Sequence, residues 1–153
     1  MTEKENSTKQ EQPSIAINSQ YIKDLSLEIP FAPEIFKELN SSPEMDIKID
    51  VDAKHLEGNV FNVELKMEMN SDVNGKKLFV LELTYAAVAV LNVPKEHVEP
   101  VLLVEIPRIL FPFARSIITN TLVDGGLPPF MLNPIDFASM YAARKQAETE
   151  IKN

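Results

Sequence analysis

Four stretches of this chain alternate between apolar and polar residues with a period of two, the pattern of a strand with one buried face. They cover approximately residues 15–29, 45–52, 61–69 and 77–91. A strand that stops alternating is usually covered on both faces. The last stretch does so, since its second side carries Val80, Ala86, Val88 and Val90. We therefore predict four antiparallel strands in one sheet.

The first stretch shows how the two sides divide. The side expected to face the core carries Ile15, Ile17, Tyr21, Leu25, Leu27 and Ile29. Ser19 and Lys23 are the only residues that break it. The opposite side carries Asn18, Gln20, Asp24, Ser26 and Glu28. This alternation predicts that Tyr21 points inward, whereas Asp24 and Glu28 point outward.

The segments between the stretches carry turn signals. Asn74 and Gly75 are the residue types that adopt positive φ in a type I′ turn, so the third and fourth strands should form a hairpin. Residues 30–44 contain three prolines and a Ser-Ser pair, which predicts a connector with one helical turn.

After Pro94 the apolar period becomes helical. We expect one helix near residues 96–106, interrupted by Pro107, and a second over 108–123 that ends at Gly125 and Gly126. Pro112 would sit in the first turn of the second helix, where its missing N–H is harmless. For a last helix, Asn133 is the expected N-cap, followed by Pro134 at the first helical position. The predicted fold class is α+β, a four-stranded antiparallel sheet with helices packed on one face.

The stretch from Val101 to Phe137 is unusually apolar for a domain of this size. Prolines and the Gly-Gly pair divide it into pieces, and none of its helices has a purely polar face. It should therefore be covered on more than one side. One cover is the chain's own sheet, and we expect the other to be a second copy of the chain.

Length and composition favour a single domain of a protein that acts in the cytoplasm. We expect a disordered polar arm over residues 1–14, a folded domain over 15–147 and a polar tail over 148–153. The polar N-terminus does not resemble a secretory signal, and no apolar run is long enough to span a membrane. Cysteine is absent, which removes disulfides and thiolate chemistry.

The net charge of −8 argues against nucleic acid and anionic membranes as partners. On the sides of the strands expected to point outward, Lys48 and Lys66 stand against eight acidic residues, a net charge near −6. The eight are Asp24, Glu28, Asp46, Asp50, Asp52, Glu64, Glu68 and Glu82. This pattern is typical of a solvated sheet face, and it also fits a docking surface for a basic partner.

Nothing in the sequence indicates an enzyme, a cofactor or a metal site. His55 and His97 have no catalytic partner nearby in sequence, and Ser116 lacks the surroundings of a nucleophile. Gly125 and Gly126 follow a helix instead of preceding one, so they cannot hold a phosphate at a helix N-terminus. Metal-ligand spacings do not occur.

Two apolar loop segments allow two interpretations. Phe31, Ile35, Phe36 and Leu39 lie in the proline-rich connector, and Phe130, Met131 and Leu132 precede the last helix. Such residues most often cap a core. They could instead line a groove for an extended peptide, where each buried leucine-sized side chain would contribute roughly 1.5–3 kcal/mol.

Two of these segments resemble a known family. Residues 106–137, IPRILFPFARSIITNTLVDGGLPPFMLNPIDF, resemble the ILFPYAR…GxFPxLxLxPVNF signature of SecB, the export chaperone of Gram-negative bacteria. Residues 21–36, YIKDLSLEIPFAPEIF, resemble that family's YxKDxSFExPxAPxxF. The similarity extends over about residues 15–143.

The resemblance implies a SecB-like fold that assembles as a homotetramer, a dimer of dimers, with an eight-stranded sheet across each dimer. It implies an ATP-independent chaperone that binds unfolded preproteins and delivers them to the SecA ATPase. The family's SecA-binding residues align with Asp24, Glu28, Val80 and Glu82. Its client peptide groove points to Phe31, Phe36, Phe130 and Leu132.

The chain departs from the family pattern in three places. Leu39-Asn40-Ser41-Ser42 replaces a connector that commonly holds a tryptophan, Ala86-Ala87 replaces a frequent Gly-Gly pair, and the acidic tail is short. Two alternatives remain open, a SecB-like chaperone dedicated to one client such as an antitoxin, and an oligomeric small-ligand-binding protein.

Overall fold

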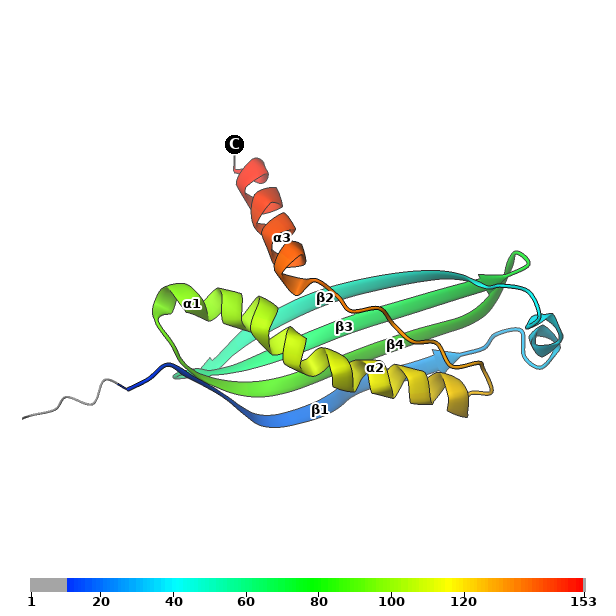
Figure 1. Cartoon of the computed structure of the whole chain (residues 1–153), viewed down its shortest axis with the longest axis horizontal. Helices are drawn as coiled ribbons and strands as arrows, with labels where there is room; N and C mark the ends of the chain where they lie inside the picture. The colour runs from blue at the N-terminus through cyan, green and yellow to red at the C-terminus, as the bar shows by residue number, and fades with distance from the viewer. Residues whose placement is uncertain (1–10, 153) are drawn as a thin grey trace, which may run out of the picture.

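The computed structural model describes residues 11–152 and shows a four-stranded antiparallel sheet with helices on one face (Figure 1). The strands are β1 (Ser14–Glu28), β2 (Glu44–Glu57), β3 (Val60–Val73) and β4 (Lys76–Asn92), in the order β1-β4-β3-β2. The predicted α+β fold class is confirmed. All four strands are long, and Asn74 and Gly75 both have positive φ in the predicted hairpin turn between β3 and β4.

The helical elements follow the strands, apart from one short turn. The 3₁₀ helix η1 (Glu34–Glu38) is the single turn predicted for the connector. After β4 come α1 (Lys95–Pro100), the π-helical turn η2 (Val101–Glu105), α2 (Ile106–Asp124) and α3 (Phe137–Ile151). Figure 1 shows α2 lying along one face of the sheet and α3 projecting away from it.

The core lies between α2 and the sheet. Leu110, Ala114, Ile118 and Leu122 recur every four residues along α2, so they form one stripe, and all are fully buried. This stripe packs on the sheet face that carries Leu81 and Leu83, which we call the inner face; the opposite face is the outer face. Ile109 and Phe113 lie on another side of α2 and are exposed.

β1 departs from simple alternation through two β-bulges, between Ile17 and Ser19 and between Ile22 and Asp24. A bulge inserts one extra residue and so exchanges the two sides of the strand. Between the bulges Tyr21 therefore points outward, where its hydroxyl donates to Asn62 Oδ1 at 2.6 Å. Gln20 points inward and accepts from the Tyr85 hydroxyl at 3.0 Å.

The predicted orientations of Tyr21 and Gln20 were therefore wrong. The second bulge restores the original phase, so Leu25 and Leu27 lie on the inner side and Asp24 and Glu28 on the outer side, as predicted. Ser19 and Lys23 looked like breaks in the inward side because the two bulges turn that part of the strand over.

The structure corrects the predicted helix boundaries at Pro107, at Pro112 and, in the last helix, at Asn133. Pro107 does not interrupt the helix, because η2 changes the hydrogen-bond spacing just before it: the Ile106 N–H donates to the Val101 carbonyl, five residues back. Pro107 then occupies the first turn of α2, whereas Pro112 lies inside α2 and not in its first turn. The predicted end of this helix at Gly125 and Gly126 is confirmed.

The N-cap of α3 is Asp136 and not Asn133. The chain forms neither helix nor strand over residues 127–136, so the helix begins later than predicted. The Asp136 carboxylate accepts from the Ser139 N–H at 3.0 Å and from its hydroxyl at 2.7 Å. These hydrogen bonds, chiefly the one from the hydroxyl, lower the pKa of Asp136.

The ends of the chain were predicted as polar segments. Of the arm over residues 1–14, residues 1–10 lie outside the described part, and Ser14 already belongs to β1. The polar segment 148–153 continues α3 as far as Ile151.

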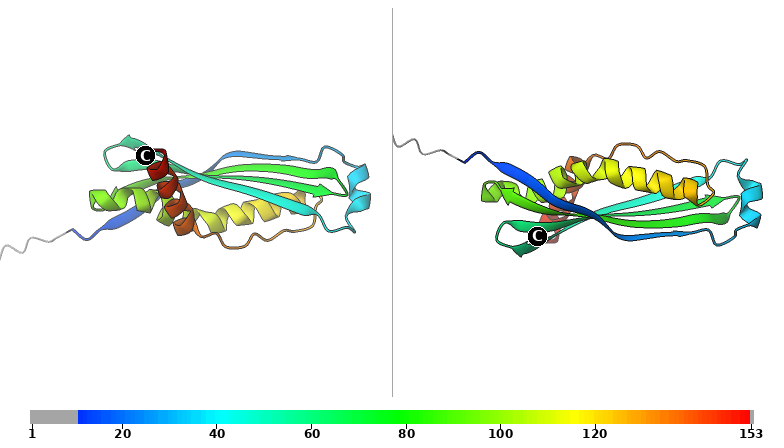
Figure 2. Two further views of the ribbon diagram at one scale, coloured as in Figure 1. Left: turned by 90° about the horizontal axis from the view of Figure 1, so that it is seen from above. Right: turned by 90° about the horizontal axis from the view of Figure 1, so that it is seen from below.

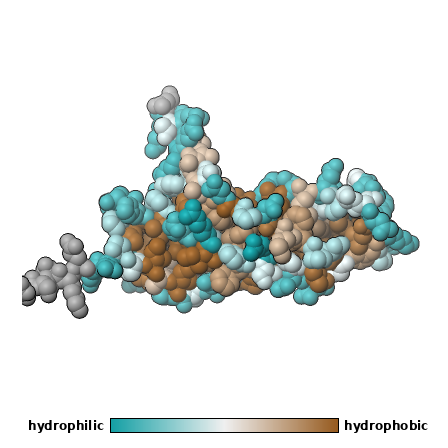
Figure 3. All heavy atoms as spheres, viewed as in Figure 1, coloured by the Kyte–Doolittle hydropathy of each residue, from teal (hydrophilic) through white to brown (hydrophobic). Residues whose placement is uncertain are grey.

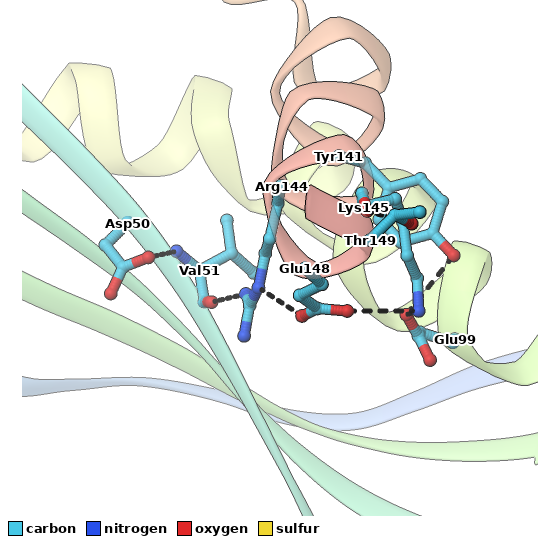
Figure 4. A network of polar contacts seen from close by, with 8 residues as sticks. All are labelled: Asp50, Val51, Glu99, Tyr141, Arg144, Lys145, Glu148 and Thr149. Atoms are coloured by element: carbon cyan, nitrogen blue, oxygen red, sulfur yellow. Dashed lines mark hydrogen bonds and ion pairs between the residues drawn. The ribbon is translucent and has the colours of Figure 1, made fainter. Parts of the chain in front are cut away.

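A polar network holds α3 against α1 and β2 (Figure 4). Glu99 of α1 pairs with Lys145 and accepts from the Tyr141 hydroxyl at 3.3 Å. On the other side, Arg144 donates to the Val51 carbonyl of β2 at 3.0 Å. The hydrogen bond from Lys145 lowers the pKa of Glu99, and the same bond raises the pKa of Lys145.

We expect acid to release this attachment only below the ordinary Glu99 pKa of 4.5. A lowered carboxyl pKa gives a stabilising contribution that is complete above the ordinary value and is lost as the pH falls through the lowered one. The raised pKa of Lys145 preserves the pair until the pH rises beyond 10.5. The NMR signals of the Tyr141 ring should therefore stay constant from above this acid limit up to the alkaline range in which Tyr141, whose own pKa is raised from 10.0 by burial, begins to ionise.

A shift of the Tyr141 signals near neutral pH would contradict this assignment. In a Glu99→Gln variant the acid transition should disappear, because the carboxyl that titrates has been removed.

Candidate functional site

The outer face gathers the acidic residues of the sheet. Cross-strand pairing places six of the eight in three successive rows: Glu28, Val80, Asn70 and Asp46; Ser26, Glu82, Glu68 and Lys48; Asp24, Thr84, Lys66 and Asp50. Asp52 and Glu64 pair with each other in the next row. Asp24, Glu28, Val80 and Glu82 thus lie together on the neighbouring strands β1 and β4. The structure brings all four predicted docking residues onto one surface, which we call the acidic face.

The sequence count missed two cations on this surface, Lys54, which pairs across the strands with Asn62, and Lys23. Lys23, turned outward by the bulges, pairs with the nearly buried carboxylate of Glu64. The hydrogen bond with Glu64, and then the attraction between the charges, raise the pKa of Lys23. Together with Lys48 and Lys66, these two lysines make four cations against the eight acidic side chains counted from the sequence, a net charge of −4. On β1 and β4, which carry the predicted docking residues, acidic side chains still outnumber lysines.

An apolar groove lies at the end of the sheet where the β3–β4 hairpin turns, and we call it the end groove. Its volume is about 340 Å³. One wall is the connector after η1, Leu39–Pro43; the other is Leu127–Phe130 after α2; the floor is Met45, Val73, Leu78, Phe79 and Leu122. The lining is mainly apolar, with Asn40, Ser41 and Ser42 as polar groups along the connector wall.

The four predicted groove residues are distributed differently. Phe130 lines the end groove, whereas Leu132 is only 4% exposed and packs in the core. Phe31 is 51% exposed outside the groove, and Phe36 is half-buried, with its ring packing near Gly126. Sequence reasoning missed the floor because Val73, Leu78 and Phe79 look like ordinary strand residues; the only signal was their place beside the predicted turn.

A second apolar surface runs along α2 and the edge strand β1. Phe113 is 50% exposed and stacks on Tyr85 with 6.4 Å between ring centroids, and Ile109, Ile22 and Leu25 are exposed as well. Burial raises the pKa of the Tyr85 hydroxyl. Figure 3 shows hydrophobic side chains gathered on the face that carries α2. An exposed apolar area of this kind usually marks an interface.

One of the two histidines, His55, has structural surroundings, whereas His97 is exposed on α1. His55 Nε2 lies 2.7 Å from the Gly58 carbonyl in the β2–β3 turn, and the His55 ring packs on Phe61. Within residues 11–152 no group of acidic, histidine or cysteine side chains is arranged to hold a metal ion. In the same range, none of the helices is both long and apolar enough to cross a bilayer.

Comparison with known proteins gives consistent results. The family model described as preprotein translocase subunit SecB matches residues 8–148. The protein-export protein SecB of Rhodospirillum rubrum is 50% identical over 137 residues, which cover 90% of this chain and 86% of the relative. That of Paramagnetospirillum magneticum is 49% identical and covers 86% of each chain.

A solved structure shares the fold at low sequence identity. It is a SecB-like chaperone of Mycobacterium tuberculosis in complex with a peptide from the HigA1 antitoxin. The TM-score is 0.62 at 14% identity, over 79% of this chain and 90% of the other. The family match, the close relatives and the shared fold together show that the chain belongs to the SecB family of protein-export chaperones.

Proposed function

We propose that the protein holds unfolded preproteins in the end groove and delivers them to SecA through the acidic face. The observation that carries this proposal is the separation of the two surfaces, an apolar groove on the inner side and a charged face on the outer side of one sheet. Holding and release require binding alone, so the protein needs neither a catalytic group nor a cofactor. We place this activity in the cytoplasm, before export.

The end groove suits an extended apolar segment. Its floor offers side chains for hydrophobic contact, and Asn40, Ser41 and Ser42 can bond the main chain of a client that has no secondary structure of its own. A peptide held in this way would be recognised by apolar character and exposed backbone, which unfolded chains share.

Replacing Phe130 by aspartate should weaken the arrest of refolding of a denatured preprotein. Losing one buried phenylalanine contact removes roughly 1.5–3 kcal/mol, which is about tenfold or more in affinity. The matched control is Met131→Asp, because Met131 is the neighbouring residue, is 72% exposed and does not line the groove. Equal arrest by both variants would contradict the groove assignment, and arrest of only one client protein would favour a dedicated chaperone.

Replacing Glu82 by lysine should weaken association with SecA by roughly tenfold at low salt, about 1.4 kcal/mol, without changing client binding. Reversing a charge at the centre of the acidic face removes attraction to a basic partner, and the loss should shrink as salt rises. Glu96→Lys changes the net charge equally but lies on α1, away from the sheet. Titration of SecA against both variants tests the assignment; unchanged affinity for Glu82→Lys at every salt concentration would refute it.

The exposed apolar surface of α2 and the unpaired edge of β1 support self-association. An edge strand offers free backbone groups, and apolar side chains beside it need a cover. We propose the homotetramer that the family resemblance implies, with β1 edges and α2 surfaces between copies.

Light scattering should give a mass near four times the 17.2 kDa of one chain. Phe113→Glu should shift the protein to smaller species, because it places a charge in the proposed interface. A parent protein that behaves as a monomer at micromolar concentration would contradict the tetramer.

A further inference from the structure

The wall of the end groove over residues 127–130 is hydrogen-bonded to α2 through one side chain. The Thr119 hydroxyl of α2 donates to the Phe130 carbonyl at 3.1 Å, across eleven positions of the sequence. Figure 1 shows how this contact arises, since the chain after α2 reverses direction and runs back past the helix. Phe130 itself lines the groove, so the bond joins α2 directly to the surface proposed for clients.

The rest of this wall has few other attachments near Phe130. The two prolines that precede Phe130 carry no N–H and so donate no hydrogen bond. Within the described part of the chain, the bond from Thr119 is the only hydrogen bond made by residues 128–135. Apolar burial holds the wall on either side, because Leu127 and Leu132 are 5% and 4% exposed. Between these two buried leucines, the Thr119 hydroxyl is the group that fixes the backbone.

A second threonine of α2 shows what is particular about this contact. Thr121 Oγ1 lies 2.7 Å from the Ile117 carbonyl, four residues back, which is the usual hydrogen bond of a threonine inside a helix. Thr119 Oγ1 lies 3.0 Å from the corresponding Arg115 carbonyl and 3.1 Å from the Phe130 carbonyl. A hydroxyl has a single proton to donate, so Thr119 shares its proton between the helix and the wall.

We propose that Thr119 is a positioning residue for client binding, because its hydroxyl holds the Phe130 backbone where the phenylalanine ring lines the end groove. The part about clients rests on the proposed function, whereas the contact does not. One hydrogen bond between neutral groups changes the ratio of held to released wall by about twofold to tenfold. The effect is moderate because, when the wall is released, Thr119 keeps its bond to the Arg115 carbonyl, and the half-buried Phe130 can bond water.

The sequence contains no tryptophan, so Phe130→Trp introduces a single fluorescent reporter on the wall. Adding Thr119→Val removes the hydroxyl while keeping the shape of the side chain. We expect the emission to move to longer wavelength and its quenching by acrylamide to increase, because the wall spends more time away from α2. The matched control is Thr121→Val, which removes the same group from the same helix but no contact with the wall.

A conservative variant separates the hydrogen bond from the packing of the side chain. Thr119→Ser keeps the hydroxyl and loses only the methyl group, so the reporter should emit and be quenched as in the chain with Thr119 intact. Three results would overturn the assignment: an unchanged reporter in Thr119→Val, equal shifts in Thr119→Val and Thr121→Val, or a serine variant that behaves like the valine variant.

Client binding is measured in the chain without the reporter, with a leucine-rich unfolded model peptide. Thr119→Val should weaken its affinity by about twofold to tenfold, since fewer molecules hold the groove ready. In a Phe130→Ala background the same substitution should have no further effect, because the ring that Thr119 positions is gone; additive losses would overturn the positioning role. If Phe130→Ala alone left the affinity unchanged, the groove assignment and the client part of this proposal would both be refuted, while the reporter result would stand.

Discussion

The packing of α2 on the inner face of the sheet, through the buried stripe of Leu110, Ile118 and Leu122, determines which surfaces remain for partners. One helix can bury only one stripe of its own residues and one face of a sheet. The other stripe of α2, with Ile109 and Phe113, stays exposed, and the outer face of the sheet stays free to carry charge. Self-association, client binding and docking therefore use different sides of the same two-layer unit.

The position of the end groove follows from a difference in length. The continuous helical run of α1, η2 and α2 over residues 95–124 extends about 45 Å, whereas a strand of 17 residues such as β4 extends about 56 Å. The helical cover therefore cannot extend along the whole sheet. The two further views show the connector and its 3₁₀ turn closing the end of the sheet, while the chain after α2 turns back along it (Figure 2). The groove lies where these two segments meet the strands without a helix between them.

The alternation of apolar and polar residues was sufficient to predict the four strands, the hairpin and the outward direction of Asp24, Glu28 and Glu82. It could not place Tyr21, because paired bulges leave the same apolar residues on the inner side at both ends of β1 and turn over only the part between them. The predicted helix boundaries were wrong at two places where the local sequence allows two arrangements. Pro107 can follow a π-helical turn without ending the helix, and Asp136 can cap the last helix as well as Asn133 can. The groove was the least predictable feature, since its floor comes from residues that alternation assigns to the core and its walls meet only through tertiary contact.

β4 carries both proposed functions within two consecutive residues. Phe79 forms part of the groove floor on the inner side, and Val80 lies beside Glu28 on the acidic face. Because successive side chains of a strand point to opposite faces, a client and a docking partner can contact this strand at the same time without touching each other. Hand-over then does not require the partner to displace the client from its site. Coupling between the two events can pass through the strands that carry both surfaces, β4 among them, and thermodynamic reciprocity requires that a partner which weakens client binding is itself bound less tightly when the groove is full.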